Sequence, residues 1–392
     1  MITRFHVENY KALRDVTLEL TPIHVLIGPN DSGKTSLLEA IGALSRSVDV
    51  PLAEAFLGAW KGPRLVWNQR EDLNVTFSVE LVNGLGAFSG NYEISVAFHP
   101  TERQVFRKRE LFHGDAPYPA NLGGHSLVSM VLRQNFACED QQRRECREVQ
   151  MALSACCVAR WTGRMLALPS ALNPNRQFQI DPSGFGLASC LDDILGDRGG
   201  RFEKIESRFR NYFPQVRSIK LKQTEAYECP YDAAAAVPQL RQTRGKGIFF
   251  EFVDGGDDIA ADQVSEGMLL VLAYLTILNL PKPPRLLLVE EPENGIHPRR
   301  LADILTILKE LVADQKECQV ILTTHSPYVL DHFQPEEVTL CRKGSDGAIC
   351  VRRLSESQTV NDQKDIFTLG EIWAGEGDEA LMEKSSEAVT QP

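Results

Sequence analysis

The sequence predicts an α/β fold with a parallel core sheet, an antiparallel β layer and a helical insertion in the middle of the chain. Three observations lead to this prediction. A glycine-rich loop lies between an apolar strand and a helix near the N-terminus, strands alternate with helices from residue 247 to 323, and apolar residues have helical spacing from about 120 to 245. Strands that are separated by helices form parallel sheets, which explains the first part of the prediction.

Length and composition are those of an ordinary globular protein. The chain has 392 residues, a net charge of −11 and nine cysteines, which form no Cys-x-x-Cys pair. This pattern predicts reduced thiols in a cytoplasmic protein, with neither a disulfide framework nor a zinc site. The sequence contains no apolar run of 18 residues and begins without the apolar core of a signal peptide, so we expect no contact with a membrane.

The sequence pattern near the N-terminus predicts β-strands. Residues 2–7 and 16–20 alternate between apolar and polar side chains, which is typical of a β-hairpin, and residues 23–27 form an apolar strand. A helix follows the glycine loop and is expected to run to about Ser45. Alternation returns at 73–81 and 92–98, which predicts a second hairpin joined by residues 83–86.

The middle of the chain predicts helices. Apolar residues have helical spacing over 126–136, 143–167 and 202–213, and the adjacent Cys156 and Cys157 are expected on the second of these helices. After residue 247, strands are expected at 248–253, 286–289 and 319–323. One helix is expected to end near Leu280 and another to span 298–314. A polar, acidic tail is expected at the C-terminus. The expected divisions are therefore 1–110, an insertion at 111–246, a second half at 247–355 and a tail at 356–392.

The glycine loop fits the pattern G-x-x-x-x-G-K-[ST] from Gly28 to Thr35. Glycines let consecutive backbone N–H groups point at phosphate oxygens, and the N-terminus of the following helix adds a partial positive charge. Lys34 is expected to reach the β- and γ-phosphates, and the Thr35 hydroxyl is expected to bind Mg²⁺. The predicted nucleotide-binding residues of this loop are Asn30, Asp31, Ser32, Gly33, Lys34, Thr35 and Ser36.

Two later strands end in side chains suited to the same chemistry. Residues 286–289 lead into Glu290 and Glu291, and residues 319–323 lead into His325. The carboxyl ends of parallel strands meet at the edge of a sheet where ligands bind. Glu290 is expected to hold Mg²⁺, Glu291 to orient or deprotonate the attacking water, and His325 to lie near a γ-phosphate.

This order of motifs resembles the P-loop ATPases of the ATP-binding-cassette (ABC) type. Within them it is most similar to the soluble branch that contains RecF, SMC heads and the AAA-type ATPases of overcoming-lysogenization-defect (OLD) nucleases. The stretch Glu290-Glu291-Pro292-Glu293-Asn294-Gly295-Ile296-His297-Pro298 is especially similar to the last group. The resemblance covers roughly residues 1–100 and 247–340, and not the insertion.

The resemblance implies a homodimer, or a higher homo-oligomer, in which two protomers enclose ATP. It makes Lys34, Glu291 and His325 the catalytic residues, with Glu291 as base and His325 as the γ-phosphate switch. Ser265 and Gly267 would complete the partner's nucleotide site, and Asn294 would lie at the dimer seam. Three features depart from the family pattern: Glu266 replaces one of the two glycines of the signature, Glu290 replaces an aspartate, and Gln69 is the only candidate for the metal-binding glutamine.

The implied function is a Mg²⁺-dependent ATPase that acts as a switch for a separate effector, such as a nuclease or toxin, in bacterial anti-phage defence or DNA repair. No guanine-recognition motif is present, which favours ATP, and too few residues follow the switch strand for the nuclease domain of OLD proteins. The alternative is a RecF-like ATPase that binds DNA directly, because the middle of the chain is basic whereas the rest is acidic. A transporter cassette is a weaker third hypothesis, against which the large insertion argues. The candidate DNA contacts are Arg143, Arg144, Arg147, Arg201, Lys204, Arg208, Arg210 and Lys220.

Overall fold

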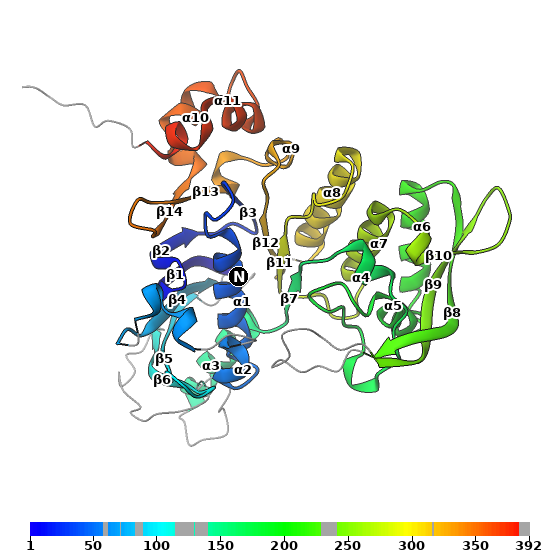
Figure 1. The fold of residues 1–392 in the computed structure, drawn as a ribbon, viewed down its shortest axis with the longest axis horizontal. Helices are drawn as coiled ribbons and strands as arrows, with labels where there is room; N and C mark the ends of the chain where they lie inside the picture. Colours follow the sequence, from blue (N-terminus) through cyan, green and yellow to red (C-terminus); the bar gives the residue numbers. More distant parts are fainter. Residues whose placement is uncertain are drawn as a thin grey trace, which may run out of the picture. The chain divides into compact units, whose positions relative to one another are not determined.

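A computed structural model describes residues 1–57, 62–70, 72–82, 89–113, 129, 140–228, 241–315 and 317–383. The chain divides into two compact units (Figure 1). The first consists of Met1–Cys156 together with Gln319–Pro392, and the second consists of Cys157–Cys318. The predicted turn at 83–86 and the predicted helix at 126–136 lie outside the described residues.

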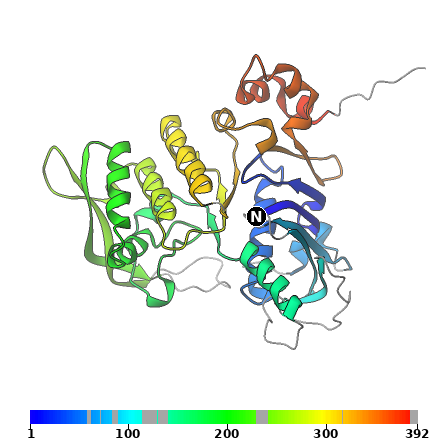
Figure 2. The same cartoon turned by 180° about the vertical axis from the view of Figure 1, so that it is seen from behind.

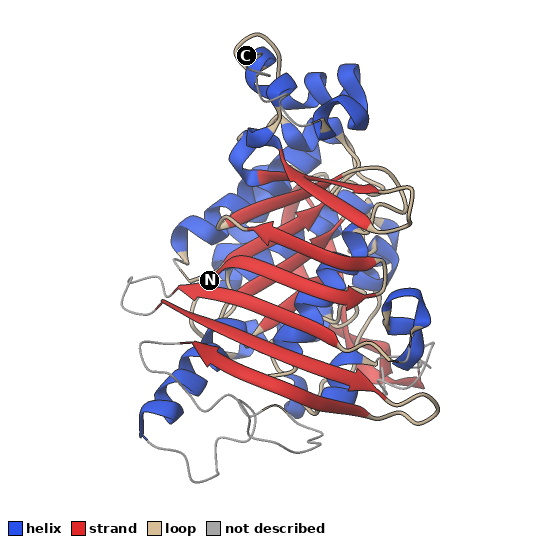
Figure 3. Cartoon of the chain, turned by 90° about the vertical axis from the view of Figure 1, so that its left-hand side faces the viewer, coloured by secondary structure: helices blue, strands red, loops and turns tan. Residues whose placement is uncertain are grey.

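The first unit contains a five-stranded antiparallel sheet in the order β2-β1-β4-β5-β6. Figure 3 shows its strands side by side, with the N-terminus at the start of β1. In β4 buried and half-buried residues alternate strictly, as expected for a sheet with one covered face. Both predicted hairpin pairings are confirmed. The strands are β1 (Ile2–Tyr10), β2 (Leu13–Glu19), β4 (Val75–Val82), β5 (Ser89–Phe98) and β6 (Val105–His113).

Four further strands of this unit lie in the order β14-β13-β3-β12. β3 is parallel to both β12 and β13, which confirms the predicted parallel core, and β14 is antiparallel to β13. All five residues of β3 and of β12 are buried. The Gln319 side chain accepts a hydrogen bond from Ile2 N at 3.0 Å and donates one to Ile2 O at 2.8 Å, which ties β1 to β12. The strands are β3 (Ile23–Ile27), β12 (Gln319–Thr323), β13 (Val338–Lys343) and β14 (Ile349–Arg353).

The helices of the first unit include two in the C-terminal extension, which was expected to be polar and acidic. α10 and α11 bury Val360, Ile372 and Leu381. α3 contacts β4, and its last residue, Leu153, is fully buried (Figure 2). The helices are α1 (Lys34–Arg46), α2 (Leu52–Phe56), α3 (Asp140–Leu153), α9 (Pro327–Leu330), α10 (Gln358–Gln363) and α11 (Leu369–Met382), and the 3-10 turns are η1 (Gly62–Leu65), η2 (Trp67–Gln69), η5 (Pro335–Glu337) and η6 (Leu354–Glu356).

The second unit combines a three-stranded sheet, two neighbouring strands and five helices. α7 is buried on almost every side, and its Tyr274 ring lies 4.9 Å from that of Trp161. The sheet has the order β10-β9-β8, and β7 is the neighbour of β11. The strands are β7 (Cys156–Ala159), β8 (Val216–Glu228), β9 (Arg241–Phe252), β10 (Ile259–Ala260) and β11 (Leu286–Glu290); the helices are α4 (Gly163–Ala167), α5 (Leu187–Gly196), α6 (Arg201–Tyr212), α7 (Glu266–Leu278) and α8 (Pro298–Asp314), with 3-10 turns η3 (Pro174–Arg176) and η4 (Ala261–Gln263).

The single helix predicted for 143–167 is wrong. α3 ends at Leu153, Ala155 adopts a left-handed φ of 56°, and the chain then enters β7. A non-glycine residue in that conformation ends a helix, so Cys156 and Cys157 lie on a strand. The long hairpin of β8 and β9 also shows that the insertion holds a β element beside its helices. Among the described residues, no helix has the length and apolar character needed to span a bilayer.

His24 on β3 predicts a specific pH dependence of stability. Its ring is fully buried between the hydroxyls of Thr21 and Thr339, and burial lowers the pKa of His24 from 6.5 to about 3. Between those values the unfolded chain binds one more proton than the folded chain, so stability falls as the pH falls below about 6.5. We expect this group to contribute a loss of about 2 kcal/mol between pH 7 and pH 5.

Urea unfolding of the wild type and His24→Asn at both pH values measures this contribution. The variant should be less stable at pH 7 and should lose less stability on acidification. His332→Asn, which alters an exposed histidine, should keep the wild-type difference. An equal acid loss in His24→Asn and the wild type would contradict the prediction.

Candidate functional site

The glycine loop has the conformation that phosphate binding requires. It follows the buried strand β3 and ends at Gly33, which is the N-cap of α1 with a φ of 85°. Because Gly33 has no side chain, no side-chain cap occupies the N–H groups of the first helical turn. Gly28 and Asp31 also have positive φ values, 137° and 65°. A loop of this conformation at the positive end of a helix dipole is suited to an anion.

Lys34 lies inside this loop. Its side chain is buried, and Nζ donates to Gly28 O at 2.7 Å, to Pro29 O at 2.9 Å and to Ser32 Oγ at 3.3 Å. His325 Nδ1, at the end of β12, lies 3.5 Å from the same Nζ. A buried ammonium group is costly unless counter-charge is available, so this site favours an anion. The structure therefore brings two of the predicted catalytic residues together.

The remaining loop residues lie at the surface or close to it. Asn30, Asp31 and Thr35 are exposed, Ser36 is half-buried and Ser32 is buried. Asp31 Oδ2 accepts a hydrogen bond from Lys343 Nζ at 2.6 Å, which links the loop to the end of β13. Thr35 lies in the first turn of α1, and a hydroxyl oxygen is a suitable ligand for a hydrated metal ion.

The loop also packs closely on the β13–β14 hairpin, which the sequence did not predict. A Cβ atom on Gly28 would lie 2.1 Å from Cys341 O, and one on Gly33 would lie 2.6 Å from Ile349 Cγ1. The first contact is with backbone, which cannot yield, and the second is with the buried side chain of Ile349, which would have to move. These two glycines are therefore required by packing as well as by backbone conformation.

The two predicted acids end β11, in the second unit. Glu290 forms an ion pair with Arg160, and the Glu290 side chain is only 18% exposed. Glu291 has a φ of 47°, and its Oε2 accepts a hydrogen bond from Asn294 Nδ2 at 2.7 Å. Left-handed backbone at a non-glycine residue costs on the order of 1–3 kcal/mol and is concentrated at functional sites. The structure thus brings Glu291 and Asn294 together and gives Glu290 a cationic neighbour.

Glu266, which stands where the family signature has a glycine, makes contacts that a glycine could not make. Ser265 is the exposed N-cap of α7, and Gly267 is buried in the first turn. Between them, Glu266 accepts a hydrogen bond from Gly163 N at 2.6 Å, and a Cβ on Gly295 would lie 2.5 Å from its Oε2. An acid in the first turn also interacts favourably with the helix dipole. Glu266 therefore connects the starts of α7 and α4 and packs against the segment that follows β11.

Gln69 lies in the first unit. It is exposed, adopts a left-handed φ of 55° within η2, and its backbone N donates to Val66 O at 2.9 Å. Arg160 is not among the predicted site residues, because it directly follows β7, a strand whose sequence predicts part of a helix. The only available signal was the β-branched Val158 within the apolar run before it.

Three of the basic side chains proposed to contact DNA are engaged in ion pairs. Arg201 pairs with Asp197, Arg208 pairs with Glu310, and Lys220 lies between Glu251 at 3.1 Å and Asp258 at 3.0 Å.

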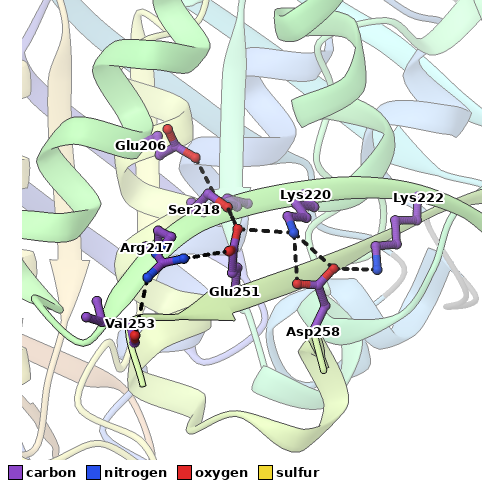
Figure 4. A network of polar contacts seen from close by, with 9 residues as sticks. Glu206, Arg217, Ser218, Lys220, Lys222, Glu251, Val253 and Asp258 are labelled. Carbon is purple, nitrogen blue, oxygen red and sulfur yellow. Dashed lines mark hydrogen bonds and ion pairs between the residues drawn. The ribbon is translucent and has the colours of Figure 1, made fainter. Parts of the chain in front are cut away.

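Figure 4 shows the last of these networks. Asp258 also pairs with Lys222 at 2.5 Å, while Glu251 accepts from Ser218 at 2.8 Å. Hydrogen bonds from Lys222 and Lys220 lower the pKa of Asp258, so this carboxylate stays charged near neutral pH. Such pairing reduces the positive charge that these residues offer to a phosphate backbone. Arg147, Lys204 and Arg210 are exposed, and the side chains of Arg143 and Arg144 lie outside the described residues.

Comparison with known proteins gives matches along most of the chain. Residues 1–111 match the family described as "AAA ATPase domain", and residues 172–331 match "AAA domain, putative AbiEii toxin, Type IV TA system". The chain is 21% identical over 403 residues to an OLD nuclease of Thermus scotoductus, covering 94% of this chain and 68% of the relative.

Two further similarities agree with this result. The chain is 23% identical over 363 residues to the DNA replication and repair protein RecF of Geobacter metallireducens, covering 82% of this chain and 92% of the relative. A crystal structure of an SMC head bound to the C-winged helix domain of ScpA superimposes with a TM-score of 0.57 and 14% identity, covering 91% of this chain and 99% of the other. The last similarity establishes the fold alone, which is that of a P-loop NTPase.

Proposed function

We propose that this chain, which matches AAA ATPase family models in two segments and is similar to an OLD nuclease and to RecF, is a Mg²⁺-dependent ATPase that acts as a dimeric switch. The observation that supports this most directly is Lys34, buried in the glycine loop at the start of α1 with His325 beside it. In this proposal ATP is the nucleotide, and the loop residues Asn30 to Ser36 surround its phosphates.

The side chains fit the nucleotide and the metal. Lys34 and the N-terminus of α1 supply positive charge for phosphates, while Thr35 and Glu290 supply the hydroxyl and carboxylate oxygens that Mg²⁺ prefers. Glu290 is paired with the cationic Arg160, so Mg²⁺ would have to compete with that guanidinium for the carboxylate. Bound Mg²⁺ would neutralise phosphate charge in the transition state. Gln69 remains a further candidate for the metal, although it is exposed in the first unit.

In the proposed ATP hydrolysis, a small number of residues have separate roles. Glu291 removes a proton from the attacking water, and Asn294 holds the Glu291 carboxylate in place at 2.7 Å. Lys34 stabilises charge on the phosphates, and His325, 3.5 Å from Lys34, senses the γ-phosphate. Ser265, exposed at the start of α7, and Gly267 complete the site of a second protomer.

The proposed output is control of a separate effector. Residues 1–110 and 247–355 form the ATPase head, residues 111–246 transmit its state, and 356–392 form a C-terminal extension. Binding energy from the γ-phosphate, shared by two protomers, biases a two-state interface. The similarity to an OLD nuclease supports a nuclease or toxin as effector, in anti-phage defence or DNA repair in the bacterial cytoplasm.

Phosphate release by the purified chain, measured with ATP and with or without Mg²⁺, tests the proposal. We expect turnover only when Mg²⁺ is present, and light scattering should show a larger mass with ATP than with ADP. A chain that binds ATP but keeps one mass in every nucleotide state would contradict the dimeric switch. If the chain does not bind ATP, it is not an ATPase and the whole proposal is wrong.

A direct DNA-binding ATPase is the second candidate, favoured by the similarity to RecF. The ion pairs of Arg201, Arg208 and Lys220 argue against it. Electrophoretic mobility shifts at low salt, with and without ATP, distinguish the two. Binding that weakens steeply with salt would support this candidate, and no binding in either nucleotide state would remove it.

A further inference from the structure

One face of the β1–β2 hairpin carries a histidine and two carboxylates close together. Side chains alternate along a strand, so His6 and Glu8 of β1 lie on the same face. Phe5 and Val7 point to the other face and are fully buried. Asp15 of β2 lies directly opposite Glu8 in the strand register. All of these residues belong to the first unit, and β1 is paired with β2 on one side and with β4 on the other (Figure 3).

The three side chains have the spacing of metal ligands. His6 Nε2 lies 3.0 Å from Asp15 Oδ1 and 3.9 Å from Glu8 Oε1, and one ligand atom from each residue lies within 4.8 Å of the other two. Tetrahedral Zn²⁺ has bonds of about 2.0–2.2 Å to nitrogen and oxygen, which places its ligand atoms about 3.3–3.6 Å apart. Small side-chain rotations on a fixed backbone would therefore bring all three ligands to bonding distance.

The charges of this cluster favour a cation. Glu8 and Asp15 are like charges directly opposite each other on neighbouring strands, a pairing that destabilises a sheet. A proton on His6 Nε2 can be donated to one carboxylate, whereas a metal ion in its place binds the nitrogen and both carboxylates. The side chains are 28% exposed at His6, 44% at Glu8 and 73% at Asp15, so an ion can reach them from solvent.

The same face has room for further ligands of an ion. A hollow of about 260 Å³ is lined by Arg4, His6, Thr17, Ser78 and Glu80. Arg4 pairs with Glu19 at 3.4 Å and with Glu80 at 3.3 Å, so acids outside the cluster balance much of its charge. A metal site with three protein ligands keeps an open position for water or another small ligand, and the hollow can hold such a molecule beside His6.

We propose that His6, Glu8 and Asp15 bind a first-row divalent metal ion of the Zn²⁺ class. An imidazole ligand favours such ions over Mg²⁺, which prefers oxygen ligands in octahedral geometry. The site is separate from the Mg²⁺ proposed for the nucleotide, and it does not depend on the proposed function. It contains no cysteine, so the cysteine pattern of the sequence could not predict it.

Calorimetric titration of the full chain with Zn²⁺, under reducing conditions, tests the site in the wild type, His6→Ala and Glu8→Gln. Each variant should bind Zn²⁺ at this site at least about 100-fold more weakly, because loss of a direct ligand should exceed the 10- to 100-fold effect of outer-shell partners. Titration with Mg²⁺ should show no difference between the proteins. Zn²⁺ should also raise the unfolding temperature of the wild type more than that of either variant.

The Glu8→Gln variant separates a metal site from a merely structural cluster. Without metal it should be at least as stable as the wild type, because it removes the repulsion between Glu8 and Asp15. Lower stability without metal, together with unchanged Zn²⁺ affinity, would overturn the inference. Equal Zn²⁺ binding by the wild type and His6→Ala would overturn it as well.

Two control variants exclude other ligands for Zn²⁺. Cys350→Ser alters an exposed cysteine and His332→Asn alters an exposed histidine, and both should keep the wild-type affinity. Loss of the site in Cys350→Ser would assign the ion to a thiol and overturn the inference. His6→Ala should bind ATP as the wild type does, so a chain that binds no ATP would contradict the proposed function and leave the Zn²⁺ result unaffected.

Discussion

Glu291→Gln is expected to bind ATP and to hydrolyse it about 10²- to 10⁴-fold more slowly than the wild type, which is the usual effect of losing a general base. Glutamine has the shape of glutamate and can still accept the hydrogen bond from Asn294, so the segment after β11 should keep its conformation. Without turnover, the ATP-bound state should accumulate. The variant should therefore show a larger mass with ATP than the wild type does.

Phosphate release, ATP binding and light scattering should be measured together on Glu291→Gln. Glu317→Gln is a suitable control, because Glu317 pairs with Arg285 at 3.0 Å and both side chains are at least one-third exposed. Its turnover should equal that of the wild type. Unchanged turnover in Glu291→Gln would show that another group activates the water.

Lys34→Met should abolish measurable ATP binding, with a loss of affinity on the order of 10²-fold or more. The methionine keeps most of the side-chain volume and removes the ammonium group that faces the phosphates. It also removes the hydrogen bonds to Gly28 O and Pro29 O, so the loop itself should become less stable. Calorimetric titration with ATP measures the first effect, and thermal unfolding without nucleotide measures the second.

Lys343→Met provides the comparison for Lys34. Lys343 pairs with Asp31 of the same loop at 2.6 Å, but its side chain is 44% exposed. An exposed pair of this kind contributes about 1 kcal/mol or less, so ATP affinity should change by less than about fivefold. If Lys34→Met binds ATP as the wild type does, the loop is not the nucleotide site.

The best predictions from sequence concern segments with strong local signals. The helix predicted at 298–314 and the strand predicted at 319–323 coincide with α8 and β12, because Pro298 fixes the first helical position and the strand is a short, fully buried run. The proximity of Lys34 and His325 followed from the rule that parallel strands bring their carboxyl ends to one edge.

The failures concern contacts between distant segments. The helix predicted over β7 is wrong because a short apolar run has no decisive periodicity. The pairing of Arg160 with Glu290 joins residues 130 positions apart and depends on the placement of β7 beside β11, which no local pattern encodes. The hydrogen bond between Glu266 and Gly163 is another long-range contact, and from sequence alone Glu266 stands out only as a departure from a family pattern.

The close packing of Gly28 and Gly33 affects how relatives that have lost ATPase activity would be recognised from their sequences. Cys341 O and the buried Ile349 side chain leave no room for a side chain at Gly28 or Gly33. A descendant of this fold that had lost its enzymatic role would still need both glycines in order to fold. In such a lineage the two glycines would be retained at the same spacing although no nucleotide is hydrolysed. Replacement of Lys34, and not loss of a glycine, would then identify a pseudoenzyme.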